Sequence, residues 1–204
     1  TSTMDDDAPR LETEGQIKKL EDEIERLRHL VYFDELTGVL NRRGFLHGAD
    51  AEFRLVSSGT STIERRVGVQ IPFAIVFCDL DNFKELNDTH GHAVGDEALK
   101  LCAQIFSHSL RQGDMIGRWG GEEFVIALAG VGATNAERIA EKLRANLEKA
   151  QLVWEGVHIA MSGSFGVALC HNGDTLHDII ARADRAMYEA KKSGKNRVVV
   201  SPER

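Results

Sequence analysis

The sequence predicts an α+β fold, and three features of its apolar pattern carry the prediction. A continuous apolar run covers residues 73–78, two short apolar runs flank Gly120-Gly121, and segments with apolar residues three or four apart lie between and after these runs. Strand and helix patterns therefore follow one another as β-α-β-β-α-β, with an additional C-terminal α-β. This order matches a ferredoxin-like core with a central, mostly antiparallel sheet, preceded by an N-terminal amphipathic helix.

Composition limits the class of protein. The 204 residues are 42% hydrophobic, which suffices for one core plus an appendage. The net charge of −7 argues against DNA or RNA binding through a basic surface, but it allows a nucleotide bridged to carboxylates by divalent cations. No apolar run approaches about 18 residues, so we expect no membrane contact. Three widely spaced cysteines without a CxxC pair predict free thiols in a reducing, cytoplasmic setting.

The N-terminal part predicts a tail and a long helix ahead of a folded domain at 33–204. Residues 1–14 are polar and acid-rich, which is typical of a disordered tail. Within 15–32 the apolar residues alternate at spacings of three and four: Ile17, Leu20, Ile24, Leu27 and Val31. β-Branched residues at a and leucine at d favour a parallel two-stranded coiled coil, and hence a homodimer through this helix. The alternative is an amphipathic helix that lies on its own domain.

The next stretch predicts a turn, a helix and a buried strand. Gly38 and Asn41 interrupt the periodicity, which predicts a turn leading into a helix that begins near Asn41, and 57–62 is a Ser/Gly/Thr-rich loop. Pro72 precedes the apolar run 73–78, which suits a strand buried on both faces. The following pattern predicts one helical turn at 83–87, a glycine-containing loop at 89–95 and a helix from Asp96 onward.

Gly120-Gly121 predicts a β-hairpin with a tight two-residue turn, because turns that match strand twist need positive φ. Glu122 and Glu123 follow where the second strand begins, and successive strand residues point to opposite faces. Taken alone, the stretch is more simply explained as a surface hairpin with a solvated acidic shoulder. Beyond it we expect a helix around 139–147, a half-buried strand over 159–169, a helix over 176–190 closed by Gly194, and a strand at 198–200.

The predicted topology brings carboxylates together. The third strand of such a core runs antiparallel beside the first, so Asp79 at the end of the first strand would meet Glu122 and Glu123 at the start of the third. Hard Mg²⁺ takes oxygen ligands, usually one or two carboxylates plus substrate phosphates. A two-metal phosphoryl-transfer site is therefore possible at this sheet edge. Asp81 either joins this set or caps the helix that begins near Phe83.

Six separated motifs in one order resemble the GGDEF family of diguanylate cyclases, over roughly residues 32–201. They are Asp34-Glu35-Leu36-Thr37-Gly38 with Asn41-Arg42-Arg43, Asp79-Leu80-Asp81-Asn82-Phe83-Lys84 with Asn87-Asp88, Gly91-His92, Gly95-Asp96, Gly120-Gly121-Glu122-Glu123-Phe124, and Lys191 with Ser193-Gly194-Lys195-Asn196. A chance match of this extent is very improbable. The resemblance implies an enzyme that condenses two GTP into cyclic di-GMP and two pyrophosphates across a two-fold dimer.

The resemblance also implies roles for single residues. Asp79 and Glu122 would bind Mg²⁺, with Mn²⁺ as the alternative ion, helped by the carbonyl of Leu80. Glu123 would bind a second metal or activate the ribose 3′-hydroxyl. The implied substrate-binding residues are Asn87 and Asp96 for guanine, and Gly120, Gly121, Lys84, Lys191 and Lys195 for the phosphates. Without the resemblance, Asp96 is better explained as an N-cap after Gly95.

The segment 111–114 matches the family's RxxD site, where product binds and stops turnover. Arg111 can grip guanine or phosphate bidentately while Asp114 accepts from a second guanine, and Arg138 is a further candidate. Without the resemblance, this is a solvated ion pair at a helix end. A catalytically silent cyclic di-GMP receptor and a scaffold that only dimerises stay open as alternatives, although the intact Glu122-Glu123 pair favours the enzyme.

Overall fold

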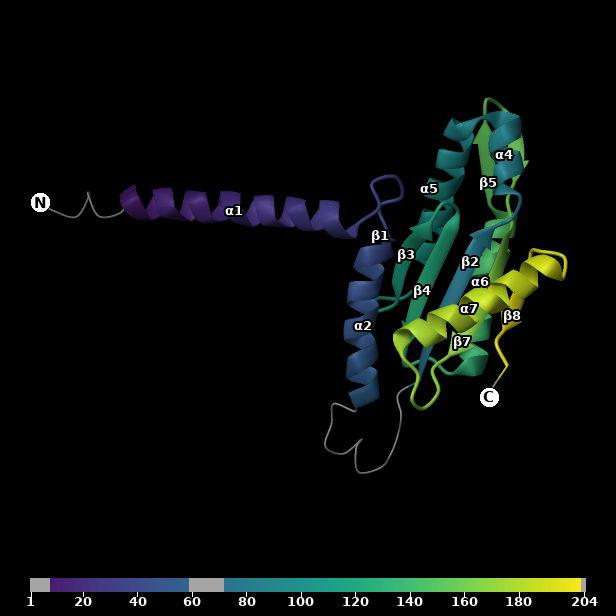
Figure 1. Ribbon diagram of the computed structural model, residues 1–204. Coiled ribbons are helices and arrows are strands. Elements are labelled where there is room, and N and C mark those ends of the chain that lie inside the picture. Colours follow the sequence, from purple (N-terminus) through teal and green to yellow (C-terminus); the bar gives the residue numbers. More distant parts are fainter. Residues whose placement is uncertain (1–7, 59–71, 203–204) are drawn as a thin grey trace, which may run out of the picture.

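The computed structural model describes residues 8–58 and 72–202, with the side chains of 8–14, 57 and 58 excepted (Figure 1). Its elements, in chain order, are α1 Ala8–Tyr32, β1 Leu40–Asn41, α2 Arg42–Ser58, β2 Phe73–Leu80, α4 Phe83–His90, α5 His92–Ser109, β3 Met115–Gly120, β4 Glu123–Ala129, α6 Ala133–Lys149, β5 Gln151–Trp154, β6 Val157–Ala160, β7 Gly163–Leu169, α7 Leu176–Lys192 and β8 Val198–Val200.

The main sheet has the strand order β1-β3-β4-β2-β7-β8. The apolar strand β2 lies in the middle and pairs antiparallel with β4 on one side and β7 on the other. Only the edge pairs β1–β3 and β7–β8 are parallel. This mixed, mostly antiparallel sheet with helices and a C-terminal α-β unit confirms the predicted α+β fold.

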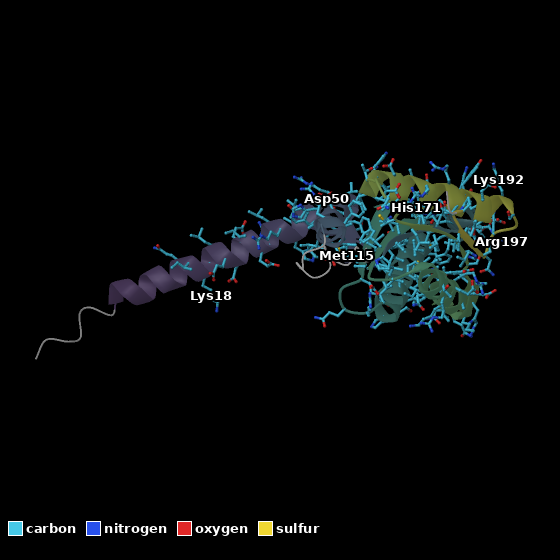
Figure 2. The ribbon with its side chains drawn as sticks, turned by 90° about the horizontal axis from the view of Figure 1, so that it is seen from below. Lys18, Asp50, Met115, His171, Lys192 and Arg197 are labelled. Atoms are coloured by element: carbon cyan, nitrogen blue, oxygen red, sulfur yellow. The ribbon has the colours of Figure 1, made fainter. Side chains whose placement is uncertain are left out.

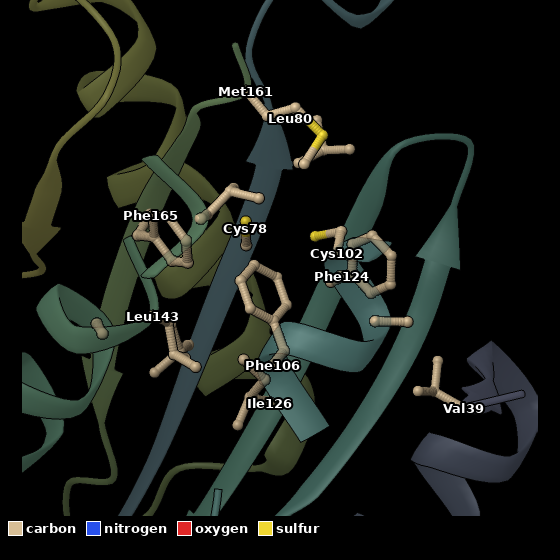
Figure 3. Close-up of a cluster of buried hydrophobic side chains, with 14 of the residues drawn as sticks. Val39, Cys78, Leu80, Cys102, Phe106, Phe124, Ile126, Leu143, Met161 and Phe165 are labelled. Carbon is tan, nitrogen blue, oxygen red and sulfur yellow. The ribbon is translucent and has the colours of Figure 1, made fainter. Parts of the chain in front are cut away.

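Helices cover both faces of the sheet (Figure 1). Side chains at odd positions of β2, such as Phe73 and Phe77, pack with α2 and α7, whereas even positions such as Val76 and Cys78 pack with α5 and α6. Phe106 of α5 meets Phe124 and Phe165 edge to face at centroid distances of 5.7 and 5.8 Å (Figure 3). Burial on both faces explains why β2 is apolar throughout, and it confirms the prediction for that strand.

The helix α1 projects away from the domain, and Lys18 lies far out along it (Figure 2). The residues of the apolar seam are between 37% and 65% exposed, so the seam does not lie on its own domain. The helix begins at Ala8 and thus includes residues 8–14, which we had assigned to a tail; the first seven residues lie outside the described part. Pairing of the seam with a second copy stays a prediction.

Two glycine-containing regions, 89–95 and the hairpin at Gly120-Gly121, differ in structure from the prediction. The predicted loop over 89–95 is wrong, because α4 and α5 are separated only by Gly91, which has a φ of 88°. The hairpin turn is also shifted by one residue: Gly120 already pairs with Glu123, so the turn consists of Gly121 and Glu122. A bulge at Trp119, between the pairs of Arg118 and Gly120, causes the shift.

The region 151–169 departs most from the prediction. A small separate hairpin, β5–β6, precedes β7, and the predicted single strand over 159–169 is therefore two strands in two sheets. The strand β7 is buried on both faces rather than one, because α7 covers one side and α6 the other. Gly166 permits this close packing, since a Cβ there would stand 2.0 Å from the carbonyl oxygen of Ala183 in α7.

Three smaller expectations can be checked. All three cysteines are free, and burial raises the pKa of the Cys78 and Cys102 thiols well above the usual range, so neither thiol is activated. The loop expected at 57–62 falls largely outside the described residues, since α2 runs to Ser58. No helix in 8–58 or 72–202 combines the length and apolar character needed to cross a bilayer.

Candidate functional site

Acidic residues from two distant parts of the sequence lie at the end of β2. Asp79 in β2 is the direct cross-strand partner of Glu123 in β4, so their side chains leave the sheet on the same face. Glu122 occupies the hairpin turn, and its carbonyl accepts a hydrogen bond from the Leu80 amide at 3.3 Å. The register therefore brings together the acidic residues that the sequence placed in two distant segments.

Asp79 is a buried carboxylate with incomplete compensation. The residue is 4% exposed, and its Oδ2 lies 2.6 Å from Nζ of Lys191, while its buried Oδ1 has no hydrogen-bond partner among the described residues. Burial raises the pKa of the Asp79 carboxyl; Lys191 offsets part of this rise, and the charges of Glu122 and Asp81 add to it. One oxygen of this carboxylate thus points into a buried space without a donor.

Glu123 is subject to the same crowding. Burial raises the pKa of its carboxyl, and the negative charges of Asp79 and of Asp184 on α7 raise it further. Within 8–58 and 72–202, no three His, Cys, Asp or Glu side chains are close enough to form a complete metal cage by themselves. A pair of carboxylates with one unpartnered buried oxygen nevertheless fits a hard divalent cation, because such ions complete their shell with water and phosphate oxygens.

The hairpin turn is held by Arg118, a residue that our sequence analysis left without a role. Its Nε and Nη2 donate to the carbonyl of Gly121 at 2.9 and 2.8 Å. Its Nη1 meets both carboxylate oxygens of Asp34 at 3.2 Å. Burial opposes ionisation of Asp34, yet hydrogen bonds from Thr37 and the charge of Arg118 lower the pKa of its carboxyl. The turn after α1 is therefore tied directly to the glycine tip.

Asn41 strengthens this connection. Its side-chain amide donates to the carbonyls of Val31 and Phe33 at the end of α1, and its Oδ1 accepts from the amide of Gly44 in the first turn of α2. A single side chain thus caps the end of one helix and the start of the next. The only earlier signal for this was the predicted helix start near Asn41, which is confirmed.

Asn87 and Asp96 lie on opposite sides of the α4–α5 junction. Asn87 packs against α5 at Gly95, where a Cβ would stand 2.0 Å from its Oδ1, and this buried Oδ1 has no partner among the described residues. Asp96 is exposed within α5, so the alternative that it caps a helix is wrong. The buried Asn87 oxygen without a donor and the exposed Asp96 carboxylate therefore belong to neighbouring helices, and their role as readers of guanine stays a prediction.

The lysines assigned to phosphate are distributed around the same strand end. Lys191 reaches Asp79 from α7, and Lys195 donates to the side-chain oxygen of Asn82 just before α4. Lys84 is exposed in the first turn of α4. The N-cap residue of α4, Asn82, makes no side-chain cap bond, which leaves the first backbone N–H groups of this helix available to an anion.

The RxxD segment forms a compact turn. Arg111 bonds through Nε to Asp114 at 3.1 Å and through Nη2 to the carbonyl of Ala129, while its side chain stays 59% exposed. Arg138 lies in an exposed hollow along α6. Lys142 lies one turn later on α6 and donates to the carbonyl of Ser109, just before the RxxD turn. No signal in the sequence pointed to this contact.

Trp119 is a packing residue. Its ring lies edge-on to Phe77 and Phe45 at centroid distances of 5.8 and 6.4 Å. The guanidinium of Arg42 covers the ring at 4.3 Å from its centroid.

Comparisons with known proteins identify the family of this chain. Residues 31–197 match the profile described as "Diguanylate cyclase, GGDEF domain". Two curated Escherichia coli (strain K12) relatives are diguanylate cyclase DosC, 38% identical over 84% of this chain, and diguanylate cyclase DgcM, 33% identical over 90%. The chain spans only 35% and 41% of their lengths. The coiled coil and GGDEF domain of DgcB from Caulobacter crescentus, in complex with c-di-GMP, superimposes with a TM-score of 0.83 at 24% identity, over 95% of this chain and 98% of that one.

Proposed function

The chain belongs to the GGDEF family of diguanylate cyclases, and from this membership we propose that it condenses two GTP into cyclic di-GMP and two pyrophosphates. The observation that carries the proposal is the pairing of Asp79 with Glu123 beside the Gly121-Glu122 turn, with one buried Asp79 oxygen lacking a donor. Uncompensated carboxylates at a glycine tip are suited to a cation that also binds a triphosphate.

In this proposal Asp79, Glu122 and the carbonyl of Leu80 hold Mg²⁺, or Mn²⁺, and Glu123 faces a second ion or the ribose 3′-hydroxyl. When bound, the cations supply charge neutralisation for the phosphates. The raised pKa of Glu123 suits a group that takes up a proton from the attacking hydroxyl. Gly121 has no Cβ and a φ of 32°, so the hairpin backbone can approach the phosphates closely.

The remaining contacts proposed for GTP come from the resemblance to the family. Asn87 and Asp96 read the guanine edge, Asp96 by accepting from its N–H donors. The start of α4, with Lys84, Lys191 and Lys195, binds the phosphates. A cation bound to Asp79 would balance the carboxylate, and Lys191 would then be able to contact a phosphate oxygen instead.

Each protomer would supply half of the reaction. One GTP per protomer presents its 3′-hydroxyl to the α-phosphorus of the other, so catalysis consists mainly of positioning and charge stabilisation. The exposed seam of α1 supports a two-fold dimer, since pairing through it raises the local concentration of the second domain. Asn41 and the Asp34–Arg118 pair connect the end of this helix with the hairpin tip.

We further propose product inhibition at Arg111 and Asp114. The exposed guanidinium of Arg111 can bond a guanine or phosphate of the product, while Asp114 holds it in place. Lys142 and Arg138 add positive charge along α6.

The direct test is incubation of the protein with GTP and Mg²⁺, followed by chromatographic identification of the nucleotide products. We expect cyclic di-GMP and pyrophosphate in a ratio of one to two, and no product when Mg²⁺ is chelated. A protein that binds cyclic di-GMP but leaves GTP unchanged at high protein concentration would instead be a receptor.

A further inference from the structure

Asp81 has a set of contacts unlike that of its neighbour Asp79. Its Oδ1 accepts from the hydroxyl of Ser164 at 2.7 Å, and its Oδ2 accepts from the hydroxyl of Ser162 at 2.8 Å and from the amide of Asn196 at 3.0 Å. It makes no side-chain cap for α4, whose N-cap is Asn82, so the expectation that Asp81 caps this helix is wrong. Both oxygens are occupied by donors of the chain itself, which leaves this carboxylate poorly placed to hold a metal.

The segment that Asp81 holds has an unfavourable backbone. Lys195 and Asn196 both lie in the left-handed region, with φ of 62° and 44°, and Asn82 beside them has a φ of 58°. Such residues keep these angles only when surrounding contacts over-determine them. The Asn196 side chain supplies two of these contacts, accepting from Arg144 and donating to Glu148, both at 2.7 Å.

Packing does little to support this segment. Asp81, Asn82 and Asn196 line a hollow of about 580 Å³ between α4 and β6, so one side of the segment faces open space. Hydrogen bonds rather than apolar contacts therefore determine where the segment lies. Asp81 is the junction of these bonds, because it joins the start of β7, the end of β2 and the segment that carries Lys195.

We propose that Asp81 is a positioning residue for GTP: it fixes the backbone at Asn196 and thereby directs Lys195 toward the triphosphate. The proposal rests on the proposed function, since it takes Lys195 as a phosphate-binding residue. It assigns the first and second aspartates of the 79–81 segment to different tasks, one binding the cation and the other organising the phosphate grip.

The test is a double-mutant cycle read by binding rather than turnover. The probe is a GTP analogue with a methylene bridge between the α- and β-phosphorus, titrated calorimetrically in Mg²⁺. We expect Asp81→Ala to weaken binding about tenfold to a hundredfold, as loss of an outer-shell support does. In the Lys195→Ala background the same change should cost less than about threefold. An equal loss in both backgrounds overturns the proposal.

A conservative variant separates position from charge. In Asp81→Asn the side-chain oxygen can still accept from Ser162 and Asn196, and its amide can donate to the Ser164 oxygen. We expect analogue binding within about threefold of wild type, which corresponds to less than 1 kcal/mol. A loss as large as that of Asp81→Ala would mean that the charge is needed, and would overturn the proposal. The matched control is Thr89→Ala, which changes an exposed side chain of the same hollow near the end of α4 and should leave binding unchanged within about twofold.

A nucleotide-free measurement keeps this inference distinct from the proposed function. Hydrogen exchange of the 193–197 amides should accelerate at least about tenfold in Asp81→Ala and stay near wild type in Asp81→Asn. If the wild type neither forms cyclic di-GMP nor binds the analogue, the proposed function fails. If the exchange of the 193–197 amides is unchanged in Asp81→Ala, the positioning role fails, whether or not the wild type binds the analogue.

Discussion

Two buried aspartates in this domain have opposite surroundings. Asp79, at the end of β2, has one oxygen without a partner in the described part of the chain and like charges beside it, and the pKa of its carboxyl is raised, chiefly by burial. Asp174, in the turn between β7 and α7, is bound by Arg182 through both oxygens at 3.0 and 2.6 Å. The Arg182 hydrogen bonds lower the pKa of the Asp174 carboxyl against the opposing effect of burial.

Both oxygens of the Asp174 carboxylate have donors from the chain, whereas Nε of Arg182 and Nδ1 of His171 beside it are buried without a hydrogen-bond partner among the described residues. The carboxylate also accepts from the amide of His171 at 2.7 Å, and Arg182 additionally donates to the carbonyl of Leu169. Each oxygen of the Asp174 carboxylate therefore accepts at least one hydrogen bond from the chain. In the proposed function, this difference between Asp79 and Asp174 separates a carboxylate that serves the fold from one that serves a ligand.

The largest expected effect is on turnover, when the carboxylates at the end of β2 are substituted. Asp79→Ala or Glu122→Ala should lower cyclic di-GMP synthesis at least about a hundredfold, because the charge-stabilising arrangement is lost. Stability should change little, since the Lys191 side chain is 31% exposed and its ammonium can be solvated once Asp79 is gone. Turnover by chromatography and urea denaturation of the same samples measure both quantities. Unchanged turnover in either variant would remove that residue from the site.

The turn at Asp174 should show the reverse pattern, in which substitution lowers stability. Asp174→Asn should lower the free energy of unfolding by about 3–5 kcal/mol, because it leaves the Arg182 guanidinium, whose side chain is 7% exposed, without a counter-charge. Asp178→Asn is the matched control at the start of the same helix: it weakens a capping box and should cost about 1 kcal/mol. A loss no larger at Asp174 than at Asp178 in urea denaturation would contradict our description of the turn.

The pH dependence of stability offers a further check on Asp174. Its folded-state pKa is lowered, so its contribution is complete above the unfolded-state value of about 3.9 and is lost as the pH falls through the lower folded-state value. The stability difference between wild type and Asp174→Asn should therefore shrink below about pH 4. Urea midpoints at several pH values measure this, and a difference that persists at the lowest pH would show that the charge is not responsible.

Asp114 is intermediate between Asp79 and Asp174. Substitution of its partner Arg111 should give the smallest of the expected effects. Its side chain is 2% exposed and bound by Arg111, but the arginine itself is largely exposed and free to meet a ligand. Arg111→Ala should raise the product concentration needed for half-inhibition about tenfold, since bonds to a charged group are worth about 1.5–3 kcal/mol. Initial rates at increasing cyclic di-GMP measure it, and identical inhibition in wild type and variant would show the site to be silent.

Local pattern was sufficient for much of the fold. The apolar run before Asp79 predicted a strand buried on both faces, and the spacing of Ile179, Ala183 and Met187 predicted α7. Local pattern failed at glycine, which can either end a helix or make room for a neighbouring side chain inside one. Gly95 was taken as a helix breaker, but it lies inside α5 to make room for Asn87. The hairpin β5–β6 was missed because its strands, four residues each, are too short for a clear alternation.

The sequence by itself determined that the end of one strand meets the start of another, because strand periodicity and crossover handedness are local and general rules. It also predicted which residues would carry the chemistry, and that assignment stays a prediction. Only the tertiary structure decided that Arg118 reaches Asp34 across 84 positions, that Asp81 ties Asn196 to the strand end, and that Asp79 keeps one oxygen without a partner. Such outcomes depend on register, burial and the count of donors around each carboxylate, and these quantities exist only once distant segments are packed together.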